Sequence, residues 1–239
     1  AVLRLLEAIR RLKIEKKIKL YQASTSEIFG NTKIPQNEKT PFKPSSPYAI
    51  SKLFAYWTVV NYREAYNIFA VNGILFNHES EKRGATFVTK KTTRAVADYY
   101  LGKNKVLYLG NLDAKRDWGF AGDYVVGMWK MMQHETPEDW VLATGMAYSV
   151  EDFVNMAFNY ADIDPEEYLA TSEKYMRPNE VHHLLGNSSK AQNELGWKPE
   201  TKFEDLVKMM VDHDLNLAKQ EKTLIDNNLI KPTWESPVV

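Results

Sequence analysis

Tyr48 and Lys52 are the residues whose types and spacing most directly suggest chemistry. Four positions apart on a helix, two side chains lie one above the other on the same face. A free phenol has a pKa of about 10 and is a poor base at neutral pH, but an adjacent ammonium group stabilises the phenolate. Such a pair can remove the proton of a hydroxyl group while a hydride leaves the same carbon. An incidental Tyr–Lys pair on a surface helix has the same spacing, so both interpretations stay open on this pair alone.

A second group of reactive side chains precedes this pair. Thr25 and Glu27 follow directly after a predicted strand, residues 19–23. Ligands bind at the carboxyl ends of strands in open α/β sheets, where a hydroxyl can hydrogen-bond a substrate oxygen and a carboxylate can remove or return a proton. Glu27 could equally cap the loop. The order of strand end, hydroxyl, acid and then S-P-Y-x-x-x-K is much less expected by chance, and it favours a catalytic site.

The element that carries Tyr48 and Lys52 is predicted as a helix over residues 48–66. Ser46 supplies a capping side chain and is followed by a proline, which suits the first helical position. Asn67 can adopt the left-handed conformation that ends a helix. The apolar run after it, residues 68–75, is typical of a strand buried in a parallel sheet.

Strands and helices alternate along the chain, which predicts an α/β fold whose parallel sheet has helices on both faces. The strands expected in that sheet cover residues 19–23, 68–75 and 140–144. The other expected elements are helices over 1–13, 86–101, 121–135, 149–161, 188–195 and 203–219, and a strand over 106–109. Ser149 and Asp152 have the spacing of a capping box. The residues after 219 are expected to form a loose tail.

Composition excludes several kinds of site. The chain has 31 Lys plus Arg and 31 Asp plus Glu, without the basic excess typical of proteins that bind nucleic acid. It has no cysteine, which excludes disulfides, thiolate catalysis and Cys-ligated metals. No His or carboxylate spacing suggests a metal site, and the adjacent His182 and His183 are expected at the surface. No apolar run approaches about 18 residues and no signal-peptide pattern occurs, so we expect a cytoplasmic protein with no membrane partner.

Longer stretches of the chain resemble one enzyme family. They are YQASTSEIFG, TPFKPSSPYAISKLFAYW, NYREAYNIFAVNGILFNHES, TFVTKK, LYLGNLDAKRDWG, DYV, ATG, YSVEDFV, MRPNEV and LGWKP. Together they resemble the GDP-mannose 4,6-dehydratases, a subgroup of the extended short-chain dehydrogenase/reductases. The resemblance covers residue 1 to about residue 219. The S-T-S-E order is specific, because epimerases and ketoreductases of the same fold usually carry an apolar or small residue where Glu27 stands.

The resemblance implies a lyase that converts GDP-mannose to GDP-4-dehydro-6-deoxy-mannose, with NADP as a cofactor that is reduced and reoxidised in each turnover. It implies that Tyr48 deprotonates the C4 hydroxyl of the sugar, that Lys52 holds the nicotinamide ribose and activates Tyr48, and that Thr25 hydrogen-bonds O4. Glu27 would remove the C5 proton, which is acidic because it is α to a carbonyl, and would assist the loss of the C6 hydroxyl as water.

Further ligand contacts are implied by the resemblance in the loop after residues 68–75. His78 and Arg83 would contact the cofactor, together with Tyr48 and Lys52, and Asn77 would contact the nucleotide sugar. On the residues alone, His78 could equally be a structural histidine.

The diphosphate of the nucleotide sugar would be bound by basic residues. The resemblance assigns Lys91, Arg116 and Arg177 to this task, with Arg116 and Arg177 in predicted loops. Glu180 would accept a hydrogen bond from a ribose hydroxyl or orient an arginine. On the residues alone, each basic residue could be a solvated charge.

The chain departs from the family at its N-terminus. The family begins with a strand and a G-x-x-G-x-x-G turn that seats the dinucleotide pyrophosphate at a helix N-terminus, and no such trio of glycines occurs here. We therefore expect an N-terminally truncated chain that lacks roughly the first 100 residues of the family. The expected fold is a partial Rossmann-type sheet plus a smaller α/β substrate-binding lobe. Its divisions are 1–76 and 119–144 for the NADP-binding part, 77–118 and 145–219 for the lobe, and 220–239 for the tail.

Two other functions remain open. The first is another extended short-chain dehydrogenase/reductase, such as a sugar-nucleotide epimerase or reductase, which Glu27 argues against. The second is a non-catalytic fragment that only binds nucleotide sugar, which the missing glycine turn supports. Because the helix over 48–66 often pairs across subunits in this family, we expect a homo-oligomer, either a dimer or a tetramer, for the full-length protein.

Overall fold

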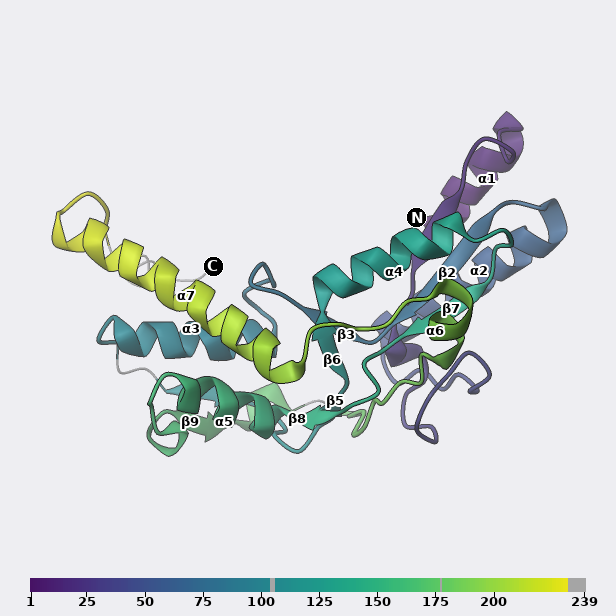
Figure 1. Cartoon of the computed structure of the whole chain (residues 1–239). Coiled ribbons are helices and arrows are strands. Elements are labelled where there is room, and N and C mark those ends of the chain that lie inside the picture. Colours follow the sequence, from purple (N-terminus) through teal and green to yellow (C-terminus); the bar gives the residue numbers. More distant parts are fainter. Residues whose placement is uncertain (104–105, 177, 232–239) are drawn as a thin grey trace.

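The computed structural model describes residues 1–103, 106–176 and 178–231, so the prediction for Arg177 lies outside the described residues. Figure 1 shows a sheet with flanking helices on one side and a group of helices on the other. The strands are β1 (Leu20–Ala23), β2 (Ala70–Leu75), β3 (Asn77–Glu79), β4 (Leu107–Leu109), β5 (Lys115–Arg116), β6 (Trp118–Phe120), β7 (Asp139–Leu142), β8 (Tyr148–Ser149) and β9 (Leu169–Thr171). The helices are α1 (Val2–Leu12), α2 (Pro47–Tyr66), α3 (Val88–Tyr100), α4 (Ala121–Gln133), α5 (Val150–Tyr160), α6 (Ser189–Leu195) and α7 (Phe203–Asp226), with short 3-10 helices η1 (Ser26–Ile28), η2 (Pro165–Glu167) and η3 (Glu173–Tyr175).

The central sheet contains β1, β2 and β7 in that order, all parallel, which confirms the three predicted strands and their direction. The register places Ala23 opposite Gly73 and Leu75 opposite Leu142. All 6 residues of β2 are buried, as expected for the middle strand of a parallel sheet that is covered on both faces. The carboxyl ends of the three strands therefore lie along one edge of the sheet.

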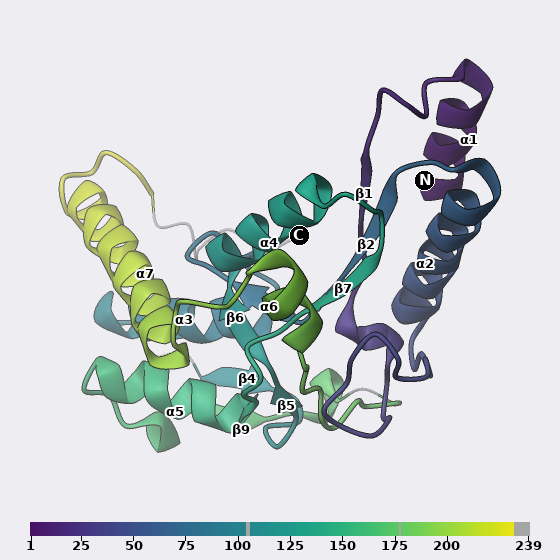
Figure 2. The same cartoon turned by 45° about the vertical axis from the view of Figure 1, so that its right-hand side comes forward.

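Helices cover both faces of this sheet, as the alternation of elements predicted (Figures 1 and 2). Adjacent residues of a strand point to opposite faces. Ala70 packs in one apolar cluster with residues of α1 and α2, whereas Val71 packs in another with Tyr124 of α4 and Trp197. Burial of both faces explains the apolar character of this strand in the sequence.

Local capping signals set the helix boundaries that the sequence predicted. The Oγ of Ser46 accepts the N–H of Ala49 at 3.1 Å, and Asn67 ends α2 with a φ of 53°. The capping box at the start of α5 is formed as well. Ser149 and Asp152 exchange hydrogen bonds of 2.7 and 2.9 Å there.

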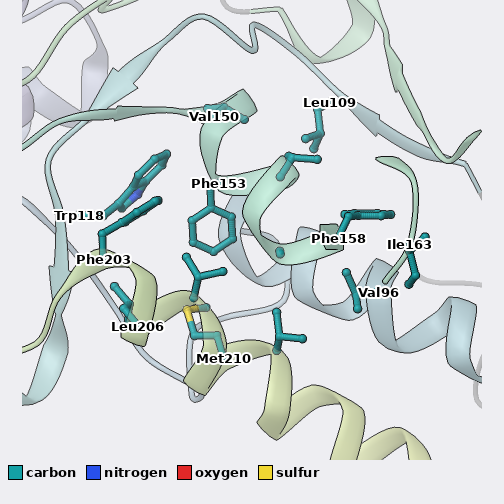
Figure 3. Close-up of a cluster of buried hydrophobic side chains, with 14 of the residues drawn as sticks. Val96, Leu109, Trp118, Val150, Phe153, Phe158, Ile163, Phe203, Leu206 and Met210 are labelled. Carbon is teal, nitrogen blue, oxygen red and sulfur yellow. The ribbon is translucent and has the colours of Figure 1, made fainter. Parts of the chain in front are cut away.

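A second apolar core lies between α3, α5 and α7 (Figure 3). Phe153 of α5 and Met210 of α7 belong to it. An ion pair crosses the same interface: Lys90 Nζ of α3 lies 2.6 Å from Asp214 Oδ1 of α7, and Thr93 Oγ1 donates to Asp214 Oδ2 at 2.6 Å. Because both charged groups are paired and hydrogen-bonded, the interface can bury them.

The structure differs from the sequence-based prediction in its short elements and at its C-terminal helix. Three two-stranded pairings occur, β3 with β6, β4 with β9 and β5 with β8, and only β4 among these strands was predicted. Strands of two or three residues contain too few positions to show a period. The predicted end of α7 at residue 219 is wrong, because the helix continues to Asp226. The segment QEKTLID consists mostly of residues that favour helix, which explains the extension.

Across residues 1–103, 106–176 and 178–231, no helix has both the length and the apolar character needed to cross a membrane. In the same part of the chain, no group of three or more His, Asp and Glu side chains gathers as a metal site requires.

Candidate active site

The carboxyl end of β1 leads into a turn that carries two of the predicted catalytic residues. Thr25 is buried and caps η1, because its Oγ1 accepts the backbone N–H of Glu27 at 3.3 Å. The hydroxyl hydrogen of Thr25 can still be donated to a ligand oxygen. The side chain of Glu27 is half-buried, and its carboxylate has no hydrogen bond or ion pair within the described residues. The Thr25 side chain and the Glu27 backbone close this turn, so the Glu27 carboxylate does not cap the loop.

Lys52 joins α2 to the same end of β1. Its Nζ donates to the carbonyl oxygen of Ala23 at 2.9 Å and lies 5.8 Å from the centre of the Tyr48 ring, one helical turn away. An ammonium group has three donors, so this bond leaves Lys52 able to donate to a ligand. The Tyr48 residue is 53% exposed, so a ligand can reach it. Lys52, and with it Tyr48, is thus held at the strand end that Thr25 and Glu27 follow.

An open hollow of about 760 Å³ lies beside Lys52, between β1, the first half of α2 and the first residues of α1. Ala23 and Lys52 line it. The next residue along the chain, Ser24, is buried, and its hydroxyl has no hydrogen-bond partner among the described residues. An unpaired buried hydroxyl costs free energy until a polar group satisfies it. This strand end is therefore a place where a polar ligand group would be favoured.

β3 follows the end of β2 and carries two of the predicted ligand residues. His78 Nδ1 lies 2.9 Å from the carbonyl oxygen of Phe76, and because a carbonyl only accepts, Nδ1 carries a hydrogen. The ring stacks on Tyr124 with centroids 5.0 Å apart. Burial lowers the pKa of His78, which favours the neutral ring and leaves Nε2 as an acceptor. Asn77 is half-buried and pairs with Trp118 of β6.

Arg83 is held inside its own loop. Its Nε lies 3.0 Å from Oε2 of the buried Glu79, and its guanidinium carbon lies 3.6 Å from the centre of the Phe87 ring. Thr89 Oγ1 donates to the same carboxylate at 2.7 Å. Glu79 was not singled out from the sequence, although its spacing of four residues from Arg83 is that of a helix-type ion pair.

The buried Arg116 pairs with the half-buried Glu180. Arg116 Nη2 donates to Glu180 Oε1 at 3.1 Å, and Nη1 donates to the carbonyl oxygen of Lys115 at 2.9 Å. Glu180 thus contacts an arginine, as one of the two roles left open for it requires, and its contact with a ribose hydroxyl stays a prediction. The Nζ of Lys91 lies 4.9 Å from the centre of the Tyr175 ring.

Two predictions about this region are wrong. Arg116 does not lie in a loop but in β5, opposite Tyr148 of β8, where the residue is 8% exposed. His182 is exposed as predicted, whereas His183 is half-buried, with its Nε2 enclosed and without a partner in the described part of the chain. His183 follows the paired Glu180 by three residues, and the strand-like pairing with Lys115 turns it inward.

Asp117 organises the loops around Arg116, and no sequence pattern pointed to it. It is fully buried and accepts hydrogen bonds from Thr144 N at 2.8 Å, Thr144 Oγ1 at 2.6 Å, Gly145 N at 2.9 Å and Gly186 N at 3.3 Å. Burial raises the pKa of Asp117 despite these bonds. One carboxylate thus joins the loop after β7 to the segment that follows Glu180.

A second, partly buried network holds α2 against the sheet. Asp139 at the start of β7 accepts from Arg63 Nη1 and Nη2 and from Asn72 Nδ2, each at 2.9 Å, and from Tyr56 Oη at 2.9 Å. Burial acts to raise the pKa of Asp139, but the bonds from Arg63, Asn72 and Tyr56 outweigh it and leave the pKa below its usual range. Sequence patterns did not reveal this network, because its members come from three separate elements.

Solved structures define the class of fold. The structure of RMD from Pseudomonas aeruginosa complexed with NADPH matches with a TM-score of 0.80 at 19% identity, covering 90% of this chain and 72% of that one. A dTDP-glucose 4,6-dehydratase from Bacillus anthracis str. Ames in complex with NAD matches with a TM-score of 0.78 at 21% identity, covering 89% and 65%. The chain therefore has the Rossmann-type α/β fold of these proteins, as predicted.

Sequence comparison gives the family. The family model described as GDP-mannose 4,6 dehydratase matches residues 1–210. GDP-mannose 4,6 dehydratase 2 of Arabidopsis thaliana is 55% identical over 226 residues, 94% of this chain and 61% of that protein. The human GDP-mannose 4,6 dehydratase is 49% identical over 235 residues, 91% of this chain and 63% of that protein. The chain belongs to the GDP-mannose 4,6-dehydratase family, and it spans about three fifths of the length of these relatives.

Proposed function

We propose that the protein converts GDP-mannose to GDP-4-dehydro-6-deoxy-mannose and water. The observation that carries the proposal is the carboxylate of Glu27, which has no partner within the described residues and follows the strand end that Lys52 contacts. A 4-epimerase needs a base at the C4 hydroxyl, but it does not need a carboxylate that can remove the proton of C5. The names of the relatives, at about 50% identity, support the same reaction.

Each residue of the site has a role in this reaction. Tyr48, next to the Lys52 ammonium, takes the proton of the C4 hydroxyl as the C4 carbonyl forms, and Thr25 donates a hydrogen bond to O4. The new carbonyl acidifies the C5 proton, which Glu27 removes. Glu27 then returns that proton to the C6 hydroxyl, which leaves as water with the C6–O bond electrons. The double bond between C5 and C6 that remains is reduced by hydride at C6 and takes a proton from solvent at C5, while Tyr48 releases to solvent the proton that it took from O4.

The cofactor proposed for this reaction is NADP, which when bound accepts a hydride from C4 and returns it at C6. The described residues fit its nicotinamide end. Lys52 has donors left for a ribose hydroxyl, and the buried hydroxyl of Ser24 lacks a partner beside it. His78 offers Nε2 as an acceptor, whereas Arg83 already pairs with Glu79 and would contact the cofactor only with its remaining donors.

The nucleotide end of the substrate is proposed to lie near Arg116, in the lobe formed by residues 77–118 and 145–219. Arg116 is buried and oriented by Glu180, as a guanidinium that binds a diphosphate in a fixed geometry should be. Lys91 and Asn77 are proposed to complete this region, and Arg177 belongs to the same proposal although it lies outside the described residues. Residues 1–76 and 119–144 would form the NADP-binding part.

A homo-oligomer is proposed through the outer face of α2. Ile50, Phe54 and Trp57 lie along that face and are more than half exposed, and Leu5 of the neighbouring α1 is exposed as well. Apolar side chains gathered at helical spacing on a surface mark an interaction site. A second copy of the same helix pair would cover them with a closed, symmetric interface.

Product analysis tests the proposed reaction. The protein is incubated with GDP-mannose and NADP⁺, and the nucleotide sugar is analysed by mass. The assay is run with this chain and with the chain extended at residue 1 by the glycine-rich segment of the family. We expect the wild-type protein to form a product that is lighter than GDP-mannose by one water. The Glu27→Gln variant should form no such product. A sugar nucleotide of unchanged mass and inverted configuration would contradict the dehydratase and support an epimerase.

A further inference from the structure

Asn31 connects the two ends of the candidate site. It lies four positions after Glu27, directly beyond the turn at Gly30. Its Nδ2 donates to the carbonyl oxygen of Glu180 at 2.8 Å, and its Oδ1 accepts the N–H of His182 at 2.9 Å. One side-chain amide thus pairs with the backbone on both sides of Val181, as a strand neighbour would.

The turn that carries Asn31 is fixed to the catalytic side. The N–H of Gly30 donates to the carbonyl oxygen of Glu27 at 3.3 Å, and Lys43 N donates to the carbonyl oxygen of Ile28 at 3.0 Å. Gly30 has a φ of 57°, and a Cβ there would meet the Lys43 carbonyl oxygen. The position of Asn31 relative to Glu27 is therefore set by short-range backbone bonds.

The backbone that Asn31 bonds, from Glu180 to His182, is in turn connected to Arg116, the proposed diphosphate-binding residue. The Glu180 carboxylate accepts from Arg116 Nη2 at 3.1 Å and from the N–H of Val181 at 3.2 Å. Five residues beyond Asn31, Gln36 pairs with the same segment further on, through its N–H to Leu185 O at 2.7 Å. The contacts of Asn31 and Gln36 hold the loop over residues 31–36 beside residues 180–185.

We propose that Asn31 is a positioning residue that sets the distance between Glu27 and Arg116, and so fixes where the sugar and the diphosphate of one substrate molecule lie. The inference rests on the proposed function. A nucleotide sugar spans both ends, and an error of about 1 Å in the placement of a reacting group lowers turnover severely. Asn31 acts through the backbone of Glu180, because its side chain bonds neither the Glu27 carboxylate nor the Arg116 guanidinium.

The exposure of Asn31 makes this inference testable without loss of the fold. Asn31→Leu removes both hydrogen bonds, and Asn31→Asp keeps the acceptor for His182 but places an anionic oxygen against the Glu180 carbonyl. Asn37→Leu is the matched control, because the Asn37 side chain bonds within its own loop, to Lys39 N at 2.9 Å and to Thr40. All three variants should melt within about 2 °C of the wild type.

Kinetic constants and nucleotide affinity distinguish positioning from general damage. With GDP-mannose, we expect Asn31→Leu to lower kcat/KM about tenfold, Asn31→Asp by at least as much, and Asn37→Leu by less than about twofold. With GDP, which occupies the diphosphate end without the sugar, Asn31→Leu should raise Kd by only about threefold. Equal losses for GDP-mannose and GDP, or no loss for either, would overturn the inference.

A double variant tests whether Asn31 works through Glu180. If it does, adding Asn31→Leu to Glu180→Gln should lower kcat/KM by less than about twofold further. A full additional tenfold loss would show an independent role and overturn the inference.

Failure of the proposed function is seen separately, as a wild-type protein that binds GDP but forms no dehydrated product. In that case the GDP affinities alone test the role of Asn31, and an unchanged Kd for GDP in Asn31→Leu would overturn it. A wild-type protein that does not bind GDP would overturn both the proposed function and the role of Asn31.

Discussion

Two carboxylates that lie near α2 have opposite surroundings. Asp139, near the middle and end of the helix, is half-buried, and its carboxylate accepts four side-chain hydrogen bonds from α2 and β2. Glu27, near its start, is half-buried, and its carboxylate has no partner within the described residues. A saturated carboxylate holds elements together but cannot accept another proton without losing its bonds. An unsaturated one adds little to the fold and remains available for proton transfer.

The largest expected effect is that of Glu27→Gln on turnover. The amide has nearly the same shape but cannot take a proton from C5, so kcat for product formation should fall by about 10²- to 10⁴-fold. The melting temperature should stay within about 2 °C, because the carboxylate makes no internal bond in the described structure. Glu38→Gln is the control, since its oxygen can still accept the N–H of Val141, and it should keep its activity. A Glu27→Gln variant with wild-type turnover would show that Glu27 is not the carboxylate that transfers the proton.

Asp139→Asn should show the opposite result, a large loss of stability. Removing the charge leaves the largely enclosed Arg63 guanidinium without its counterion, so the free energy of unfolding should fall by about 3 kcal/mol. Denaturant titration measures the change. The double variant Arg63→Met with Asp139→Asn should recover part of the loss, because no charge remains buried. An Asp139→Asn protein as stable as the wild type would mean that the network does not hold α2 to the sheet.

The pH dependence of stability sharpens the same contrast. The pKa of Asp139 is lower in the folded protein than in the unfolded chain, so its contribution is complete above the unfolded value of about 4 and is lost as the pH falls toward the folded value. The difference in unfolding free energy between wild type and Asp139→Asn should therefore narrow as the pH is lowered from 6 to 3. A difference that stays constant over this range would show that the charge of Asp139 is not the stabilising feature.

A smaller effect is expected at the cap of α2. Ser46→Ala removes the acceptor for Ala49 N and should lower the free energy of unfolding by about 1 kcal/mol. Ser149→Ala removes the equivalent bond at α5, far along the chain from Tyr48 and Lys52, and should cost about as much. Only Ser46→Ala should also lower kcat, because its helix carries the proton-transfer pair. Equal kcat values for the two variants would show that fraying at the start of α2 does not reach Tyr48.

Much of this arrangement could be predicted from the sequence where the signal is local. The cap at Ser46, the left-handed Asn67 and the apolar run of β2 set α2 and the sheet, and with them the approach of Lys52 to the end of β1. The remainder depends on contacts between distant residues. Arg116 with Glu180 spans 64 positions, and Asp139 with Arg63 spans 76. No periodicity or spacing links such residues. The resemblance suggested only that Glu180 could orient an arginine, without saying which one, and the Asp139 network was not predicted.

The fate of hydrogen in the reaction tests the role of Glu27 most directly. GDP-mannose is converted in D₂O, and the product is analysed by mass and by NMR. If Glu27 removes the C5 proton and passes it to the departing hydroxyl, C5 is reprotonated from solvent, so the product will have lost one water and will carry one deuterium at C5, while the hydrogen from C4 appears at C6. Glu27→Gln should give neither the loss of water nor the deuterium. A product that forms with C5 still fully protonated, or turnover in Glu27→Gln equal to that of the wild type, would contradict the account.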